Sequence, residues 1–99
     1  MLHIVNKSPF ENNTLSNCLR FIRPGAALLL IEDAVYAATK GSITESGLKE
    51  AISKAHVYAL WPDLEARGVQ DKVIDGIKLV DYSGFVDLVS ECNTTQSWL

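Results

Sequence analysis

The chain has 99 residues, of which 47% are hydrophobic and 21% are charged, and its formal net charge is −3. This length fits a single small domain over residues 1–99, and the composition excludes collagen-like repeats and low-complexity sequence. The negative charge, without any cluster of basic residues, argues against direct contact with a nucleic-acid backbone. The longest apolar run, residues 26–31, is far shorter than the roughly 18 residues that a membrane-spanning helix needs.

The first residues do not resemble a secretory signal, because residues 2–5 have no basic segment before them and no cleavage site after them. We therefore expect a cytoplasmic protein with no membrane association. Cys18 and Cys92 should stay reduced in that compartment, and their wide spacing fits neither a redox CxxC pair nor a zinc site. Each cysteine is thus a separate thiol with its own surroundings.

In the first third of the chain, the pattern predicts two short strands with one helix between them. The apolar run Leu2–Val5 predicts a strand, and Asn13 or Thr14 can cap the helix that follows. Residues 26–31 are apolar without interruption, which is typical of a strand covered on both faces and predicts the centre of a sheet. The apolar side chains of the helix recur at i, i+3, i+4 and i+7, on Leu15, Cys18, Leu19 and Ile22.

The rest of the chain continues this alternation of helices and strands. The expected elements are, in order, helix 33–38, a weaker helix 48–54, strand His56–Leu60, a short helix 64–67 started by Pro62, strand 77–80 and helix Tyr82–Glu91. Such alternation predicts a mostly parallel sheet flanked by helices in three layers, a small flavodoxin-like α/β fold. The chain ends in Trp98 and Leu99, which we expect to dock on the domain itself or on a neighbour.

Three aspartates follow predicted strands, at the sheet edge where open α/β folds usually bind ligands. Asp33, Asp63 and Asp81 would form a carboxylate cluster if this edge were a site. Capping explains them better, because Asp33 and Asp81 each stand at a helix start and Asp63 lies in a first helical turn. No glycine-rich phosphate loop and no pair of metal ligands supports a site, so we expect no cofactor and no metal.

The histidines and cysteines are the remaining candidates for chemistry. His3 and His56 fall near strand starts, opposite to the usual ligand edge, so a structural or interface role is expected. A histidine next to Cys18 would instead activate that thiol. Cys18 lies on the apolar helical stripe, which suits an inert buried residue, whereas a reactive thiol needs exposure and a lowered pKa. Cys92 follows the last helix beside Glu91, whose negative charge disfavours a thiolate.

Four sequence blocks and the terminal Trp98 resemble the DsrH/TusB family, in their order and spacing over essentially the whole chain. The blocks are LHIVNKSP at 2–9, LIEDAVYAA at 30–38, DLEARG at 63–68 and DYSGFVDL at 81–88. The resemblance implies a DsrEFH-like α/β fold and the smallest of three related subunits in a heterohexamer. Its sisters are then a DsrE/TusD-like subunit, which holds the principal carrier cysteine, and a DsrF/TusC-like subunit.

The resemblance implies a place in a sulfur relay. Such complexes pass persulfide sulfur between upstream and downstream carrier proteins, for 2-thiolation of the tRNA wobble uridine, which we favour here, or within dissimilatory sulfur oxidation. The chain is then no self-sufficient enzyme, uses no cofactor and contacts no nucleic acid directly. In the segment Ser16-Asn17-Cys18-Leu19, Cys18 resembles the cysteine of DsrH-type members and is the candidate persulfide-carrying thiol.

Two other interpretations stay open at this point. The chain is alternatively a non-catalytic subunit that only completes the complex. An unrelated small-molecule-binding module is weakened, because no phosphate-binding loop follows the first strand. The isolated chain should self-associate or be poorly soluble, because a small domain with this apolar content reserves surface for its partners.

Overall fold

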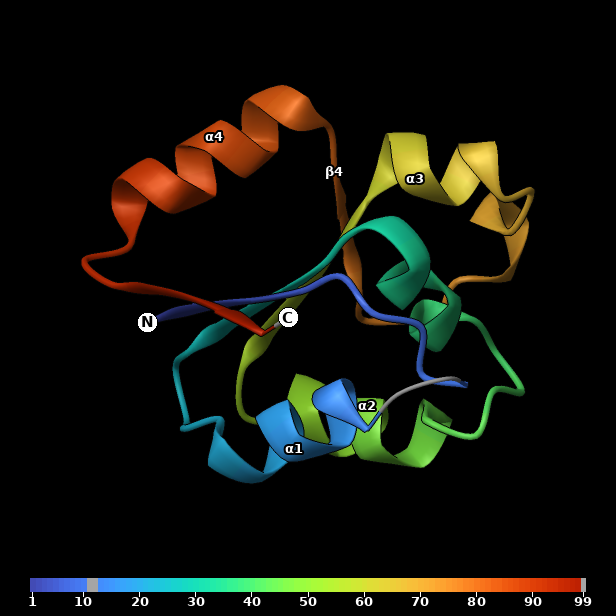
Figure 1. Cartoon of the computed structure of the whole chain (residues 1–99), viewed down its shortest axis with the longest axis horizontal. Coiled ribbons are helices and arrows are strands. Elements are labelled where there is room, and N and C mark those ends of the chain that lie inside the picture. The colour runs from blue at the N-terminus through green and yellow to red at the C-terminus, as the bar shows by residue number, and fades with distance from the viewer. Residues whose placement is uncertain (11–12, 99) are drawn as a thin grey trace.

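Residues 1–10 and 13–98 are described by a computed structural model, which shows one parallel sheet with helices on both faces (Figure 1). The strands are β1 (Leu2–Val5), β2 (Ala27–Leu30), β3 (His56–Leu60), β4 (Lys78–Val80) and β5 (Thr95–Trp98). Their order is β4-β3-β2-β1-β5, and every neighbouring pair runs parallel. β2 lies at the centre with all its side chains buried. The central strand and the three-layer α/β fold predicted from the sequence are therefore confirmed.

The connections between strands explain which helices lie on which face. The helices are α1 (Thr14–Phe21), α2 (Glu45–Ile52), α3 (Trp61–Ala66) and α4 (Tyr82–Glu91), with the 3-10 segments η1 (Glu32–Ala38) and η2 (Gln70–Lys72). From β1 to β4 each strand is added on the same side of the last, so right-handed connections keep α1 and α2 on one face. From β4 the chain returns past the whole sheet to β5, and the same handedness places α4 on the opposite face (Figure 1).

Two apolar clusters fill the space between these layers. The larger cluster lies under α1 and α2 and includes Val5, Leu15, Cys18, Leu28, Leu30 and Leu48. The smaller cluster lies under α4 and has four buried members, Leu2, Ala27, Leu29 and Leu88. Successive strand residues point to opposite faces, which is why Leu28 and Leu29 belong to different clusters. Burying one leucine side chain contributes about 2 kcal/mol, so the face under α1 and α2 contributes most of the apolar stabilisation.

The start of α4 is fixed by a cap and by a close backbone approach. Asp81 is the N-cap residue, and its Oδ1 accepts a hydrogen bond of 2.8 Å from the Gly84 amide. A Cβ on Gly84 would lie 3.0 Å from the Cβ of Val80, a tight contact that a larger residue could make only if Val80 shifted by a few tenths of an ångström. The capping role predicted for Asp81 is confirmed, and such a cap stabilises a helix by about 1 kcal/mol.

The structure also corrects the predicted elements. The sequence pattern does not predict β5, because Thr95, Gln96 and Ser97 are polar and exposed, and the strand is defined by backbone pairing with β1. Residues 33–38 belong to a 3-10 segment that starts at Glu32, not to an α-helix capped by Asp33. The helix predicted at 48–54 is α2, which begins and ends earlier in the chain.

Candidate functional site

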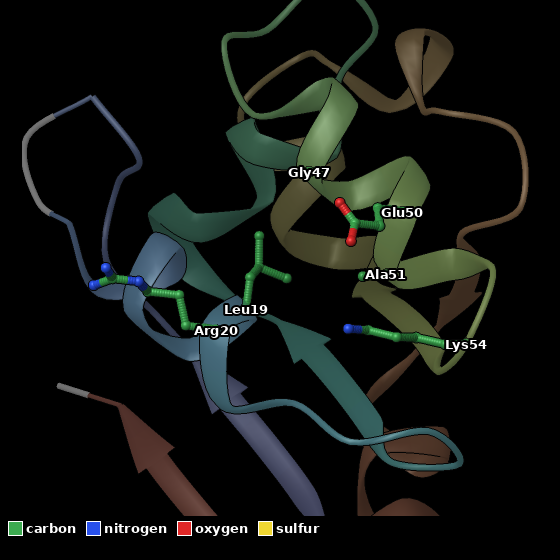
Figure 2. Close-up of a pocket in the computed structure, with 6 residues that line it drawn as sticks. All are labelled: Leu19, Arg20, Gly47, Glu50, Ala51 and Lys54. Carbon is green, nitrogen blue, oxygen red and sulfur yellow. The ribbon is translucent and has the colours of Figure 1, made fainter.

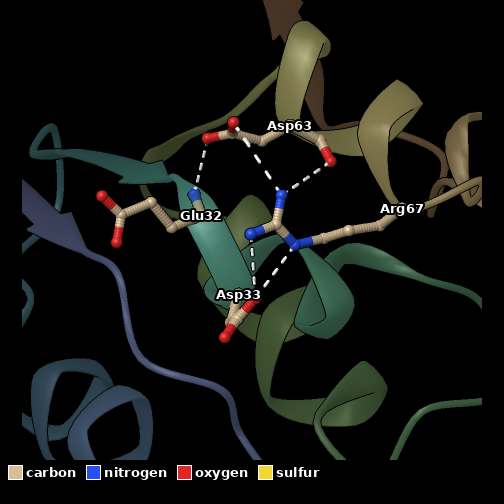
Figure 3. A network of polar contacts seen from close by, with 4 residues as sticks. All are labelled: Glu32, Asp33, Asp63 and Arg67. Atoms are coloured by element: carbon tan, nitrogen blue, oxygen red, sulfur yellow. Dashed lines mark hydrogen bonds and ion pairs between the residues drawn. The ribbon is translucent and has the colours of Figure 1, made fainter.

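The carboxyl ends of β2 and β3 are joined by a network of polar side chains, shown in Figure 3. Arg67, the residue that follows α3, donates from Nε and Nη2 to Oδ1 of Asp33 over 3.0 Å and 2.9 Å. Its Nη1 donates to the backbone carbonyl of Asp63 over 3.2 Å and lies 3.9 Å from the Asp63 carboxylate. The guanidinium therefore lies between two carboxylates that follow neighbouring strands.

Glu32 joins this network through its backbone. Its amide donates to Oδ2 of Asp63 over 2.6 Å, and its φ is +50°, a left-handed conformation that is unfavourable for a residue with a Cβ. The carboxylates of Asp33 and Asp63 are thus held by a guanidinium and a backbone amide, which is the geometry of a structural network. In the part of the chain that the structure describes, no three His, Cys, Asp or Glu side chains group as a metal site.

The outcome for the predicted aspartates is mixed. Asp33 and Asp63 do lie near each other at the carboxyl ends of the strands, where open α/β folds bind ligands, but Arg67 lies between their carboxylates. Asp81 is not part of this group, because it caps α4. The predicted cap at Asp33 is wrong, because its carboxylate pairs with Arg67, whereas Asp63 accepts the amide of another segment. Sequence reasoning missed Arg67 as their partner. The only signal was that Asp33 and Arg67 both lie in blocks that resemble the DsrH/TusB family, 30–38 and 63–68.

Cys18 lies on the inner face of α1, and its side chain is 0% exposed. It belongs to the larger apolar cluster, where burial raises the pKa of the thiol to about 12. A thiolate is therefore scarce at neutral pH, and another protein reaches the sulfur only if α1 moves. In the isolated chain, Cys18 does not meet the conditions of exposure and lowered pKa that a reactive thiol needs.

A groove with a volume of about 370 Å³ opens between α1 and α2 (Figure 2). Its walls come from α1, α2 and the turn after α2, and the lining residues are Leu19, Arg20, Gly47, Glu50, Ala51 and Lys54. Figure 2 shows Leu19 pointing into the space between the helices, with Glu50 of α2 and Lys54, from the turn after α2, reaching towards it. None of these six side chains is a thiol or an imidazole. The groove can accept a side chain of a partner, but its lining supplies no nucleophile.

His3 has a structural role, as its position at a strand start predicted. It is buried, its Nδ1 accepts a hydrogen bond of 3.1 Å from Nε1 of Trp98, and burial lowers the pKa of its imidazole. The Trp98 ring also stacks on Phe21, with centroids 6.0 Å apart. Trp98 therefore docks on its own domain, whereas Leu99 lies outside the described residues. His56 is exposed, and no hydrogen bond between described residues joins either histidine to Cys18.

The burial of Cys18 leads to a prediction about thiol labelling. At pH 8 we expect iodoacetamide to modify the half-buried Cys92 and to modify Cys18 at least about 100-fold more slowly, because a pKa near 12 leaves little thiolate and the sulfur has no access. Labelling is followed by mass spectrometry of the peptides. In denaturing urea the two thiols should react at similar rates, and comparable labelling of both in the folded chain would contradict the buried position.

Two solved structures share this fold. The crystal structure of the ychN protein from E. coli superimposes with a TM-score of 0.84 and 19% sequence identity, over 97% of each chain. The protein MTH1491 from Methanobacterium thermoautotrophicum, described as of unknown function, gives a TM-score of 0.72 and 14% identity, over 97% of this chain and 95% of that one. At these identities the likeness concerns the fold alone. Among the helices in residues 1–10 and 13–98, none has the length and apolar character that a membrane span needs.

Comparison of the amino-acid sequence identifies the family as well as the fold. Protein TusB of Pectobacterium parmentieri is 36% identical over 99 residues, which covers 99% of this chain and 100% of the relative. Protein TusB of Escherichia coli K12 is 37% identical over 98 residues, with the same coverage. The family model described as "DsrH like protein" matches residues 7–95. The chain therefore belongs to the DsrH family.

Proposed function

We propose that this chain is a sulfur-relay subunit that supports 2-thiolation of the wobble uridine in tRNA. The observation that carries the proposal is its similarity to proteins named TusB, at 36–37% identity across the full length of both chains. The proposal includes a cytoplasmic location, a single domain over residues 1–99, and a complex with a DsrE/TusD-like and a DsrF/TusC-like subunit. Upstream and downstream sulfur-carrier proteins complete the relay, and no cofactor takes part.

The chain's own surface supports a role inside a complex. The groove between α1 and α2 is lined by no thiol, and the carboxylates of Asp33 and Asp63 are already paired. A formal net charge of −3 also disfavours direct contact with tRNA, so the RNA is expected to meet the sulfur on another protein. We therefore propose that the chain works through protein partners and is not a self-sufficient enzyme.

Cys18 stays the candidate persulfide carrier of this subunit, as the family resemblance suggests. In such a step its thiolate attacks the outer sulfur of a donor persulfide. A new sulfur–sulfur bond then forms on Cys18 while the donor leaves as a thiolate, so no outside oxidant or reductant is needed. The burial of Cys18 sets a condition on this step, because a partner must first move α1 and expose the thiol.

The burial favours a second candidate role, in which the subunit completes the complex and transfers no sulfur itself. A thiol with 0% exposure and a pKa of about 12 is typical of a small apolar core residue. A third possibility, a subunit of dissimilatory sulfur oxidation, is compatible with the DsrH family match but receives no support from the named TusB relatives.

Deletion of the gene in its own host tests the proposed function. We expect the 2-thiouridine content of the wobble-modified tRNAs to fall to background, measured by liquid chromatography and mass spectrometry of the nucleosides. Re-expression of the chain should restore it. Oxidation of reduced sulfur compounds by the same strain serves as the matched measurement. If 2-thiouridine stays normal and sulfur oxidation is lost, the chain acts in sulfur oxidation instead. If both stay normal, it acts in neither relay.

A further inference from the structure

Two adjoining cavities open between the end of α1 and the part of the sheet that β1 and β5 form. Their volumes are about 390 Å³ and about 370 Å³, and four residues line both of them: Met1, His3, Phe21 and Arg23. The turn at residues 24–26 also lines the first cavity, and Trp98 of β5 lines the second. Cavities of about 300–1,000 Å³ that combine aromatic walls with a few polar groups are typical sites for small molecules.

His3 offers these cavities an unused N–H group. The indole of Trp98 can only donate, so its hydrogen bond of 3.1 Å to Nδ1 of His3 requires that this nitrogen carries no proton. The proton of the neutral imidazole is therefore on Nε2. No hydrogen bond between described residues involves Nε2, although the His3 side chain is only 4% exposed. A nearly buried donor without a partner is a group that a ligand can satisfy.

Aromatic rings and one cation complete the lining. The Trp98 ring stacks on Phe21, and its centroid lies 6.1 Å from that of His3. Phe21 is 67% exposed, so its ring can also accept a further ring from outside the chain. No hydrogen bond or salt bridge between described residues involves the guanidinium of Arg23, and none of the described lining residues is Asp or Glu. The lining therefore favours an aromatic group that carries a negative charge.

The backbone of the turn beside Arg23 indicates a carboxylate and not a phosphate. Phosphate sites usually use several free backbone amides, at a helix start or in a nest. Here the Gly25 amide donates to the Lys54 carbonyl over 2.8 Å. The Ala26 amide donates to the Arg23 carbonyl over 3.1 Å. These bonds fix the turn before any ligand binds and leave the side chains as donors, and one guanidinium matches one carboxylate.

We propose that these cavities bind a small planar aromatic carboxylate. Its ring lies against Phe21 and Trp98. Its carboxylate accepts hydrogen bonds from the guanidinium of Arg23 and from Nε2 of His3. This site involves neither cysteine, and the inference is independent of the proposed role in a sulfur relay.

The probe that tests the site is 2-naphthoate, added to the full chain labelled with fluorotryptophan and followed by fluorine NMR. The chain has two tryptophans, and Trp61 lies on α3 and lines neither cavity. We expect the Trp98 signal to shift saturably with a Kd below about 1 mM, and the Trp61 signal to stay in place. The neutral 2-naphthalenemethanol and the non-aromatic cyclohexanecarboxylate should each bind at least about tenfold more weakly.

Two variants separate the contribution of the charge from that of the ring. Arg23→Gln should bind 2-naphthoate about tenfold more weakly and 2-naphthalenemethanol as before, because only the carboxylate contacts the guanidinium. Phe21→Leu should bind 2-naphthoate several-fold more weakly and cyclohexanecarboxylate as before, because it keeps an apolar wall but loses the ring. Arg20→Gln is the matched control, since Arg20 lines the groove between α1 and α2 and neither of these cavities. Its binding of 2-naphthoate should equal that of the unchanged chain.

Several outcomes would overturn the inference. One is a Trp98 signal that does not move below about 10 mM 2-naphthoate, and another is an equal shift of both tryptophan signals. A neutral alcohol that binds as tightly as the carboxylate would show an apolar surface without a carboxylate site. If a variant is unfolded by circular dichroism, the comparison of the three probes on the unchanged chain decides alone. None of these results depends on sulfur transfer, so the proposed function is tested separately.

Discussion

Replacing Arg67 with methionine is expected to lower the free energy of unfolding by about 2 kcal/mol, although the residue lies in no apolar cluster. The Arg67 side chain is 21% exposed and makes three hydrogen bonds, two to Asp33 and one to the Asp63 carbonyl. Bonds to charged groups contribute about 1.5–3 kcal/mol, and the 58% exposure of Asp33 reduces the effect through solvent screening. Methionine keeps the aliphatic volume, so the loss reports the guanidinium contacts.

A matched control separates this network from ordinary surface charge. Lys49 forms an i, i+4 salt bridge of 3.0 Å with Glu45 on α2, and its side chain is 63% exposed. Lys49→Met should lower the free energy of unfolding by only about 0.3–0.5 kcal/mol. Arg67→Lys should lower the free energy of unfolding by an amount between these two values, since an ammonium keeps the positive charge but cannot make the paired hydrogen bonds of a planar guanidinium. Urea unfolding followed by circular dichroism measures all three, and equal losses at Arg67 and Lys49 would contradict a structural role for the network.

The fold was largely predictable because local pattern and tertiary environment agree along most of the chain. The uninterrupted apolar run at 26–31 indicated a strand covered on both faces, and β2 is the central strand with every side chain buried. The boundaries of β1, β3 and α4 follow from clear apolar periodicity, and Asp81 caps α4 as its position predicted. In these segments the local pattern of side chains is sufficient to predict the strand or helix.

The elements that were missed depend on contacts distant in sequence. β5 has exposed polar side chains and exists because its backbone pairs with β1, which lies more than ninety positions earlier. The left-handed backbone at Glu32 comes with a hydrogen bond from its amide to the carboxylate of Asp63, 31 residues away, and Arg67 meets Asp33 across 34 residues. No local pattern encodes such pairings. Only the meeting of the carboxyl ends of neighbouring parallel strands indicated that these segments would come together.

The role of Cys18 also could not be predicted from the sequence, because two inferences about it conflict. Its place on the stripe with Leu15 and Leu19 indicated an inward-facing residue, and the structure places it at 0% exposure. The family resemblance pointed to a reactive thiol at the same position. Both inferences concern one side chain, and the sequence could not choose between them, because the answer depends on whether a partner opens α1.

A variant that removes the thiol must therefore keep the core intact. Cys18→Ala is expected to lower the free energy of unfolding by about 1 kcal/mol, because a small buried group is lost and leaves a small cavity. Cys18→Ser should lower it by about 2 kcal/mol, since a hydroxyl is then buried among apolar side chains with at best a bond to its own helix backbone. Urea unfolding checks the order, and a serine variant as stable as the alanine variant would contradict the apolar surroundings.

Sulfur transfer is best tested with Cys18→Ala, whose smaller loss of stability lets assembly with the sister subunits be verified first. We expect the isolated chain to take up no sulfur on Cys18 from a persulfide donor, because the thiol is buried and its pKa is about 12. In the loaded complex we expect peptide mass mapping to find one added sulfur atom on Cys18 and none on Cys92, and Cys18→Ala to lose transfer. Cys92→Ala is the control and should transfer normally. An adduct confined to Cys92, or unchanged transfer by an assembled Cys18→Ala complex, would leave this subunit the non-carrier role that its buried thiol favours.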